Sequence, residues 1–121
     1  VELSETGLAQ ARQLGERLRD VPITSAVASP MLRARRTAEL ALGESRVARL
    51  SFDDGLKEIG HGDWEGLLAS EIRERDPSRL QAWKEAPESV MMPGPGGESL
   101  RTVADRAWPA FARACDGLGV D

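Results

Sequence analysis

The 121-residue sequence has few residues that form covalent or metal cross-links. Cys115 is its only cysteine and His61 its only histidine. A single cysteine excludes a disulfide within the chain, and this pair is too small for a zinc site built from Cys and His ligands. We therefore expect no metal and no other cofactor. Cys115 is interpreted as a small core residue rather than a reactive thiol, because it falls on the apolar side of a predicted helix.

Long apolar runs are also missing from the sequence, as is the charged, apolar and small-residue order of a secretory signal. A helix that spans a bilayer needs about 20 consecutive apolar residues. The sequence therefore predicts no membrane partner and, by default, a cytoplasmic location.

Basic residues do not gather into one positive stretch. The net charge is −4, with 16 Lys and Arg residues interspersed among 20 Asp and Glu residues. Because a nucleic-acid backbone is bound by a contiguous positive face, no nucleic-acid partner is expected. The composition is that of a globular protein, and the length predicts a single domain over residues 1–121. No sequence feature indicates an oligomeric state.

Helix and strand patterns alternate in the first half of the chain. Ser4 is a candidate N-cap of a helix with apolar residues at three- or four-residue intervals up to Leu18. Residues 23–28 predict a buried strand, and residues 47–52 predict a second one. Between the strands, the Ser29-Pro30 pair has the residue types that begin a helix, and Gly43 is typical of a helix end.

The second half of the chain has mainly helical patterns. Two short helices, separated at Asp76-Pro77, are predicted within a helical insertion at about residues 67–86. A loop rich in proline and glycine follows over residues 87–97, and then a long helix. Apolar residues mark one side of that helix: Leu100, Val103, Ala104, Ala107, Trp108, Phe111 and Ala114.

These patterns predict an α/β fold with helices around a mainly parallel sheet. Two strands are too few for this number of amphipathic helices, because a stable sheet usually has three or more strands. We therefore expect the domain to be incomplete, with one strand missing before Val1 and another missing after Asp121.

Four segments, in the correct order, resemble motifs of the histidine phosphatase superfamily, the phosphoglycerate-mutase-like proteins. Residues 28–39 resemble its S-P-x-x-R-A-x-x-T-A motif, and residues 56–66 resemble L-x-E-x-x-x-G-x-W-E-G. Residues 3–11 resemble its L-[ST]-x-x-G-x-x-Q-A helix start, and residues 95–99 its P-G-G-E-S loop. The resemblance implies a mechanism in which a histidine is phosphorylated and is then hydrolysed or passes the phosphoryl group on.

By this resemblance, Arg33 takes the place of a phosphate-binding arginine and Glu58 that of the catalytic acid that protonates the leaving oxygen. The residue types suit these roles, because an arginine fork binds phosphate and a partly buried carboxyl group can donate a proton. Spacing alone leaves other interpretations open. Arg33 could belong to a solvated face with Arg35 and Arg36, and Glu58 could be an exposed loop acid.

Neighbouring motif residues are interpreted as supports. Trp64 is expected to be buried, and Gly66 to occupy a position without room for a side chain. Glu98 and Ser99 are expected to form a helix cap that fixes the glycine-rich loop.

The R-H-G and S-H-G motifs that carry the family's histidines are absent, and His61 is interpreted as a partly packed loop histidine. The hypothesis is therefore a phosphoric monoester hydrolase of the phosphohistidine type that acts on a small-molecule phosphate ester, with no turnover by this chain alone. The alternatives are a phosphoglycerate-mutase-type phosphoryl transferase, a non-catalytic phosphate-ester-binding module and a structural fragment that completes a partner's sheet. The sequence does not select the substrate.

Overall fold

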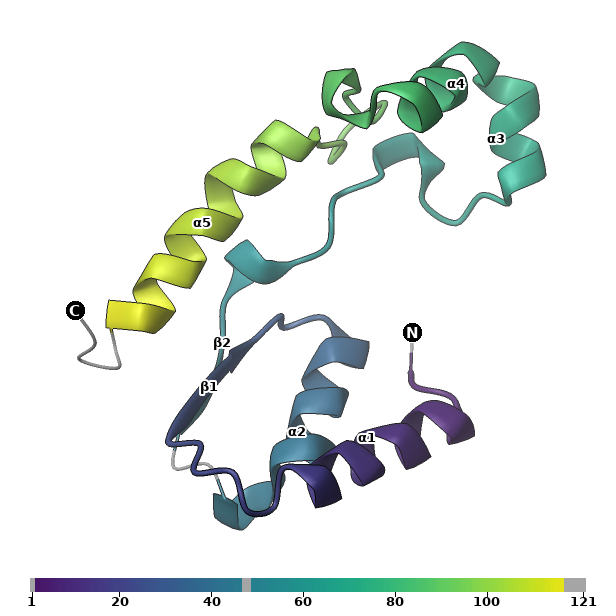
Figure 1. Ribbon diagram of the computed structural model, residues 1–121. Coiled ribbons are helices and arrows are strands. Elements are labelled where there is room, and N and C mark those ends of the chain that lie inside the picture. The colour runs from purple at the N-terminus through teal and green to yellow at the C-terminus, as the bar shows by residue number, and fades with distance from the viewer. Residues whose placement is uncertain (1, 47–48, 117–121) are drawn as a thin grey trace. The chain divides into compact units, whose positions relative to one another are not determined.

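The computed structural model describes residues 2–46 and 49–116 (Figure 1). The chain divides into two compact units, of which the first comprises Val1–Lys57 with Pro109–Asp121 and the second Glu58–Trp108. The single domain over residues 1–121 stays a prediction, and each unit is described by itself.

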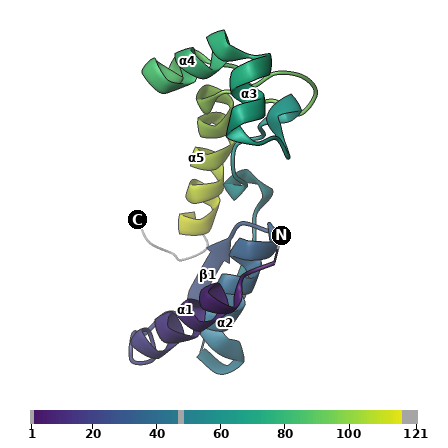
Figure 2. The same ribbon diagram turned by 90° about the vertical axis from the view of Figure 1, so that its right-hand side faces the viewer.

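The first unit contains a strand–helix–strand arrangement preceded by a helix. Its elements are α1 (Glu5–Arg17), β1 (Ser25–Ala28), α2 (Leu32–Arg46), β2 (Arg49–Phe52) and a 3₁₀ turn, η1 (Asp54–Leu56). Helices α1 and α2 pack against each other, and both views show them side by side (Figures 1 and 2). A Cβ atom at Gly15 would lie 3.0 Å from the carbonyl oxygens of Leu40 and Ala41, so this close packing suits glycine.

Strands β1 and β2 form a parallel pair, in register from Ser25 opposite Arg49 to Ala28 opposite Phe52. Helix α2 connects them, which confirms the predicted α/β class with a parallel sheet. The sheet has two strands within the described part of the chain. Residues 47–48 of the second predicted strand lie outside that part.

The start of α1 agrees with the prediction, whereas the start of α2 does not. Ser4 Oγ accepts a hydrogen bond from the Gly7 N–H at 3.0 Å, as an N-cap does. Helix α2 was expected to begin at Ser29-Pro30 but begins at Leu32. The reason is a local turn, because Ser29 Oγ accepts from the Met31 N–H at 3.3 Å and delays the helix by two residues.

Gly43 interrupts α2 where the sequence predicted its end. Its φ of 65° and ψ of 163° are not helical, although helical residues continue to Arg46. Because a positive φ favours glycine, the prediction located the break correctly but not the last helical residue.

The second unit contains two short helices and a glycine-rich loop. Its elements are η2 (Gly62–Trp64), α3 (Ala69–Arg75), α4 (Pro77–Glu85), η3 (Pro87–Ser89) and the first part of α5 (Leu100–Asp116), whose residues from Pro109 onward belong to the first unit. The predicted separation at Asp76-Pro77 is confirmed. Trp64, Val90 and Met92 are the buried hydrophobic residues of this unit within the described chain.

The apolar side of α5 is exposed to a greater extent than its spacing predicted. Trp108 is 70% exposed and Phe111 58% exposed, whereas Ala110 is fully buried. Helical spacing shows which side of a helix is apolar, but that side is buried only where another element covers it. The sequence predicted which side of the helix is apolar, and the structure shows that this side is not buried at these two residues.

Candidate active site

Arg33 lies in the first turn of α2, five residues after β1 ends at Ala28. This position, at the carboxyl end of a parallel strand and the N-terminus of the next helix, is where α/β folds bind anions. Arg33 is exposed, and its carbonyl accepts a hydrogen bond from Thr37 Oγ1 at 2.8 Å.

The neighbouring arginines of α2 pair with an acid of the same helix. Arg35 Nε donates to Glu39 Oε1 at 3.1 Å, and Arg36 Nη1 lies 3.7 Å from Glu39 Oε2. The Arg35 guanidinium also lies 4.5 Å from the centre of the Phe52 ring, a cation–π distance. Arg35 and Arg36 thus fit the solvated face that spacing left open for all three arginines.

Glu58 belongs to the second unit, whereas Arg33 belongs to the first. It precedes η2 and is exposed, so the partial burial expected of this carboxyl group is not present. Its backbone, by contrast, is fixed at one end, because the Glu58 carbonyl accepts a hydrogen bond from Arg106 Nη2 at 3.0 Å.

Two segments of the second unit, residues 60–63 and 92–98, run beside each other, and we call them the paired loops. Glu98 N–H donates to the Gly60 carbonyl at 2.9 Å, and Asp63 N–H donates to the Pro93 carbonyl at 2.7 Å. An antiparallel bridge joins His61 to Gly97 between these two bonds. The motif that contains Glu58 and the glycine-rich motif therefore form one local structure.

Glycines let the paired loops approach each other. A Cβ atom on Gly60 would lie 2.2 Å from the Gly96 carbonyl oxygen, and one on Gly97 would lie 2.1 Å from that of Met92. Gly66 differs, because nothing lies within 4 Å of its added Cβ and its φ is +75°. The expectation that Gly66 lacks room for a side chain is wrong, and its positive φ is what favours glycine there.

Glu98 and Arg106 form a bidentate ion pair beside the paired loops. Arg106 Nε donates to Glu98 Oε2 at 2.9 Å and Arg106 Nη2 to Oε1 at 2.8 Å. Glu98 Oε1 also accepts from the Gly60 N–H at 2.8 Å. The hydrogen bonds from Arg106, assisted by that from Gly60, lower the pKa of Glu98 from 4.5 to about 2.

Sequence reasoning found only part of this arrangement. The cap of α5 is Ser99, whose Oγ accepts from the Thr102 N–H at 3.1 Å. Glu98 was expected to take part in that cap, but its carboxylate turns instead to Gly60 and Arg106. Arg106 was not predicted, since an arginine eight residues after an acid is common on any charged helix.

A second bidentate pair lies in the first unit. Arg113 Nε and Nη2 donate to the two carboxylate oxygens of Asp53, each at 3.0 Å. Asp53 Oδ1 also accepts from the Gly55 N–H at 2.9 Å, which caps η1. These bonds, led by that from Arg113, lower the pKa of Asp53.

His61 lies within the paired loops. Its backbone N–H donates to Glu65 Oε1 at 2.9 Å, and its ring Nδ1 lies 3.7 Å from the same oxygen. Within residues 2–46 and 49–116, no three His, Cys, Asp or Glu side chains gather in a group that could hold a metal ion. No described helix is long and apolar enough to cross a membrane.

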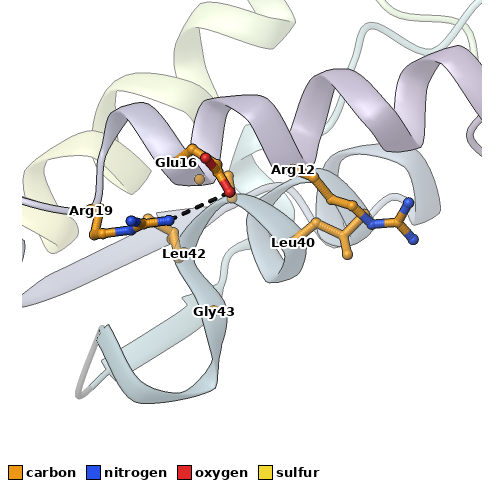
Figure 3. A pocket seen from close by; sticks show the side chains of 8 residues that line it. Arg12, Glu16, Arg19, Leu40, Leu42 and Gly43 are labelled. Atoms are coloured by element: carbon orange, nitrogen blue, oxygen red, sulfur yellow. Dashed lines mark ion pairs between the residues drawn. The ribbon is translucent and has the colours of Figure 1, made fainter.

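Each unit has a surface cleft. One of about 340 Å³ lies between α1 and α2, where Figure 3 shows Arg19 paired with Glu16 at its rim. The other, of about 530 Å³, is in the second unit, beside Trp64 and Arg75. Neither is lined by Arg33 or Glu58.

Comparison with protein families agrees with the motifs. Residues 1–119 match the model of the histidine phosphatase superfamily (branch 1). The chain belongs to this superfamily. The resemblance carried by the four motifs is thereby confirmed.

Curated relatives of this histidine phosphatase chain include both hydrolases and mutases. It is 35% identical over 105 residues to phosphoserine phosphatase 1 of Hydrogenobacter thermophilus, covering 87% of this chain and 48% of that protein. It is 34% identical over 116 residues to the 2,3-bisphosphoglycerate-dependent phosphoglycerate mutase of Rhizobium meliloti, covering 91% and 53%. The chain thus spans about half the length of these relatives.

Solved structures show the same fold. Bacillus stearothermophilus YhfR matches with a TM-score of 0.84 and 34% identity, covering 94% of this chain and 55% of that one. A mycobacterial glucosyl-3-phosphoglycerate phosphatase, in complex with inorganic phosphate, matches with a TM-score of 0.80 and 33% identity, covering 95% and 54%.

Proposed function

We propose that the protein is a phosphoric monoester hydrolase of the phosphohistidine type that acts on a small-molecule phosphate ester. In this proposal Arg33 binds the phosphate and Glu58 protonates the leaving oxygen. The observation that carries the proposal is the superfamily match along residues 1–119, which includes the motifs of both residues.

The position of Arg33 supports its role. A guanidinium in the first turn of a helix adds a planar, charged fork to the positive dipole end there. A phosphate bound by such a fork accepts charge-assisted hydrogen bonds, each contributing about 1.5–3 kcal/mol.

A substrate can reach the Glu58 side chain. The side chain is exposed, while the Glu58 carbonyl is fixed by Arg106. An alkoxide leaves poorly without a proton, and a positioned acid accelerates such a step about 10²–10⁴-fold.

We infer that these 121 residues do not turn over substrate by themselves. The phosphohistidine mechanism needs a histidine nucleophile in an R-H-G motif, and the only histidine of the chain lies in Gly60-His61-Gly62. Two other functions are also supported. The sequence identity to the Rhizobium mutase supports phosphoryl transfer between esters. The lack of both histidine motifs in these 121 residues supports a module that only binds phosphate esters.

Steady-state kinetics of the protein as its gene encodes it tests the proposal. With an alkyl phosphate monoester as substrate, Arg33→Ala should raise KM about tenfold to a hundredfold. Glu58→Gln should lower kcat about 10²–10⁴-fold. Arg36→Ala is the matched control and should change neither, because Arg36 pairs with Glu39 on the exposed side of the same helix.

The product distinguishes the three functions. A hydrolase releases inorganic phosphate through an acid-labile phosphoenzyme, whereas a mutase passes the phosphoryl group to a second ester. A binding module binds the ester saturably and forms neither product. Unchanged kinetics in both Arg33→Ala and Glu58→Gln would contradict the site assignment.

A further inference from the structure

Glu98 contacts Gly60 through its backbone and through its side chain. The Glu98 N–H donates to the Gly60 carbonyl at 2.9 Å, and the Glu98 carboxylate accepts from the Gly60 N–H at 2.8 Å. Both polar backbone groups of Gly60 are therefore held by one residue that lies 38 positions later in the sequence.

Arg106 extends this contact to Glu58. Its Nη2 donates both to Glu98 Oε1 at 2.8 Å and to the Glu58 carbonyl at 3.0 Å, while its Nε donates to Glu98 Oε2 at 2.9 Å. Glu98 and Arg106 have side chains only 20% and 24% exposed, so the two bonds between them are partly shielded from competing water.

We propose that Glu98 and Arg106 are positioning residues for proton transfer, because together they fix the backbone from the Glu58 carbonyl to Gly60. The inference rests on the proposed function of Glu58. With that backbone fixed, the torsions of its own side chain are the main freedom that the Glu58 carboxyl keeps. Catalytic groups need to be held within about 0.5 Å of their productive positions, and a 1 Å displacement can reduce the rate about a hundredfold.

Conservative substitutions of the pair can remove its hydrogen bonds while keeping the charge or the size of the side chain. A lysine at position 106 would keep the charge but could not bond both Glu98 oxygens in the fork geometry and reach the Glu58 carbonyl as well. A glutamine at position 98 would keep the size and one acceptor for Gly60 but would lose the charge that holds Arg106.

The test compares two phosphate monoesters in the protein as its gene encodes it. p-Nitrophenyl phosphate has a leaving group that departs with little need of a proton, whereas a simple alkyl phosphate needs one. Arg106→Lys and Glu98→Gln should each lower kcat for the alkyl ester about tenfold to a hundredfold, and for the p-nitrophenyl ester less than about threefold. KM should stay nearly constant for both esters.

Matched controls come from the same helix. Arg101→Lys and Asp105→Asn alter an ion pair whose side chains are 84% and 68% exposed, and they should leave both rates unchanged. Hydrogen exchange of the Gly60 amide gives a readout that needs no turnover, and Glu98→Gln should accelerate it relative to Asp105→Asn.

Glu58→Gln serves as the reference for selective loss on the alkyl ester. Suppose that Glu58→Gln loses activity selectively on the alkyl ester, whereas Arg106→Lys and Glu98→Gln either lose no activity or lose it equally on both esters. The positioning role is then overturned and the proposed function stands. If Glu58→Gln itself shows no selectivity between the esters, the acid role fails, and the positioning role fails with it.

Discussion

The two arginine–carboxylate pairs of the molecule have similar geometry but different surroundings. In the second unit, Arg106 and Glu98 are 24% and 20% exposed, and in the first unit, Arg113 and Asp53 are 59% and 20% exposed. Both acids accept two bonds from arginine and one from a glycine N–H.

The difference lies in what the glycine bond fixes. Asp53 binds the N–H of Gly55, two residues away, and so caps a local turn. Glu98 binds the N–H of Gly60, 38 residues away, and Arg106 adds the Glu58 carbonyl. Both pairs link distant parts of the chain, since Arg113 itself lies 60 residues from Asp53. The less exposed Glu98–Arg106 pair should contribute more to stability and positioning, because water competes less with its bonds.

Filling the space between the paired loops should give the largest loss of stability among the variants compared. Gly60→Ala places a Cβ atom 2.2 Å from the Gly96 carbonyl oxygen, and backbone must move to admit it. We expect the free energy of unfolding to fall by about 3 kcal/mol in urea titrations followed by circular dichroism. Gly66→Ala, with open space but a φ of +75°, is the control and should cost about 1 kcal/mol. Equal losses would show that the paired loops move apart at little cost, so that their close approach does not determine stability.

Neutralising the acids tests the comparison directly. Glu98→Gln should lower the free energy of unfolding by about 1–3 kcal/mol, because it weakens charge-assisted bonds in a partly dry site. Asp53→Asn should lower the free energy of unfolding by less than Glu98→Gln does, because Arg113 is 59% exposed and solvent weakens its ion pair. The same urea titrations measure both variants, and a larger loss for Asp53→Asn would reverse the ranking of the two pairs.

The pH dependence of stability tests the contribution of the Glu98 charge. The pKa of Glu98 is lowered from 4.5 to about 2 in the folded protein, so the pair stabilises the fold fully above pH 4.5 and loses that contribution as the pH falls toward 2. The difference in unfolding free energy between the wild type and Glu98→Gln should therefore shrink between these values. A difference that stays constant down to pH 2 would mean that the Glu98 charge is not involved.

An exposed acid with one backbone partner should give the smallest effect. Glu65 is 65% exposed and accepts from the His61 N–H at 2.9 Å. Glu65→Gln retains an acceptor for that bond, so we expect a change in unfolding free energy within about 0.5 kcal/mol. A loss comparable with that of Glu98→Gln would show that distance along the chain does not determine the effect.

Local chemistry made much of the fold predictable from sequence. The cap at Ser4, the break at Gly43 and the separation at Asp76-Pro77 depend on backbone preferences of single residues, and all three are found. The start of α2 was missed because the Ser29 hydroxyl can bond a nearby N–H in either a cap or a turn, and sequence does not choose between them.

The support of the candidate site was less predictable. The glycine-rich motif predicted a loop, but sequence could not show that its partner is the segment after Glu58. Glu98 and Arg106 meet through a fold-dependent contact, so their roles became visible only in three dimensions. The exposure of Trp108 could not be predicted for the same reason, because burial depends on which elements lie nearby.

A double-mutant cycle tests the central claim most directly, which is that Arg106 and Glu98 act on turnover through Glu58. The kcat for an alkyl phosphate is measured for Arg106→Lys, Glu58→Gln and the double variant in the gene-encoded protein. The account predicts that Arg106→Lys lowers kcat about tenfold or more in the wild type and has almost no further effect in Glu58→Gln. Equal, multiplicative losses in both backgrounds would contradict it, because Arg106 would then act independently of the proton donor.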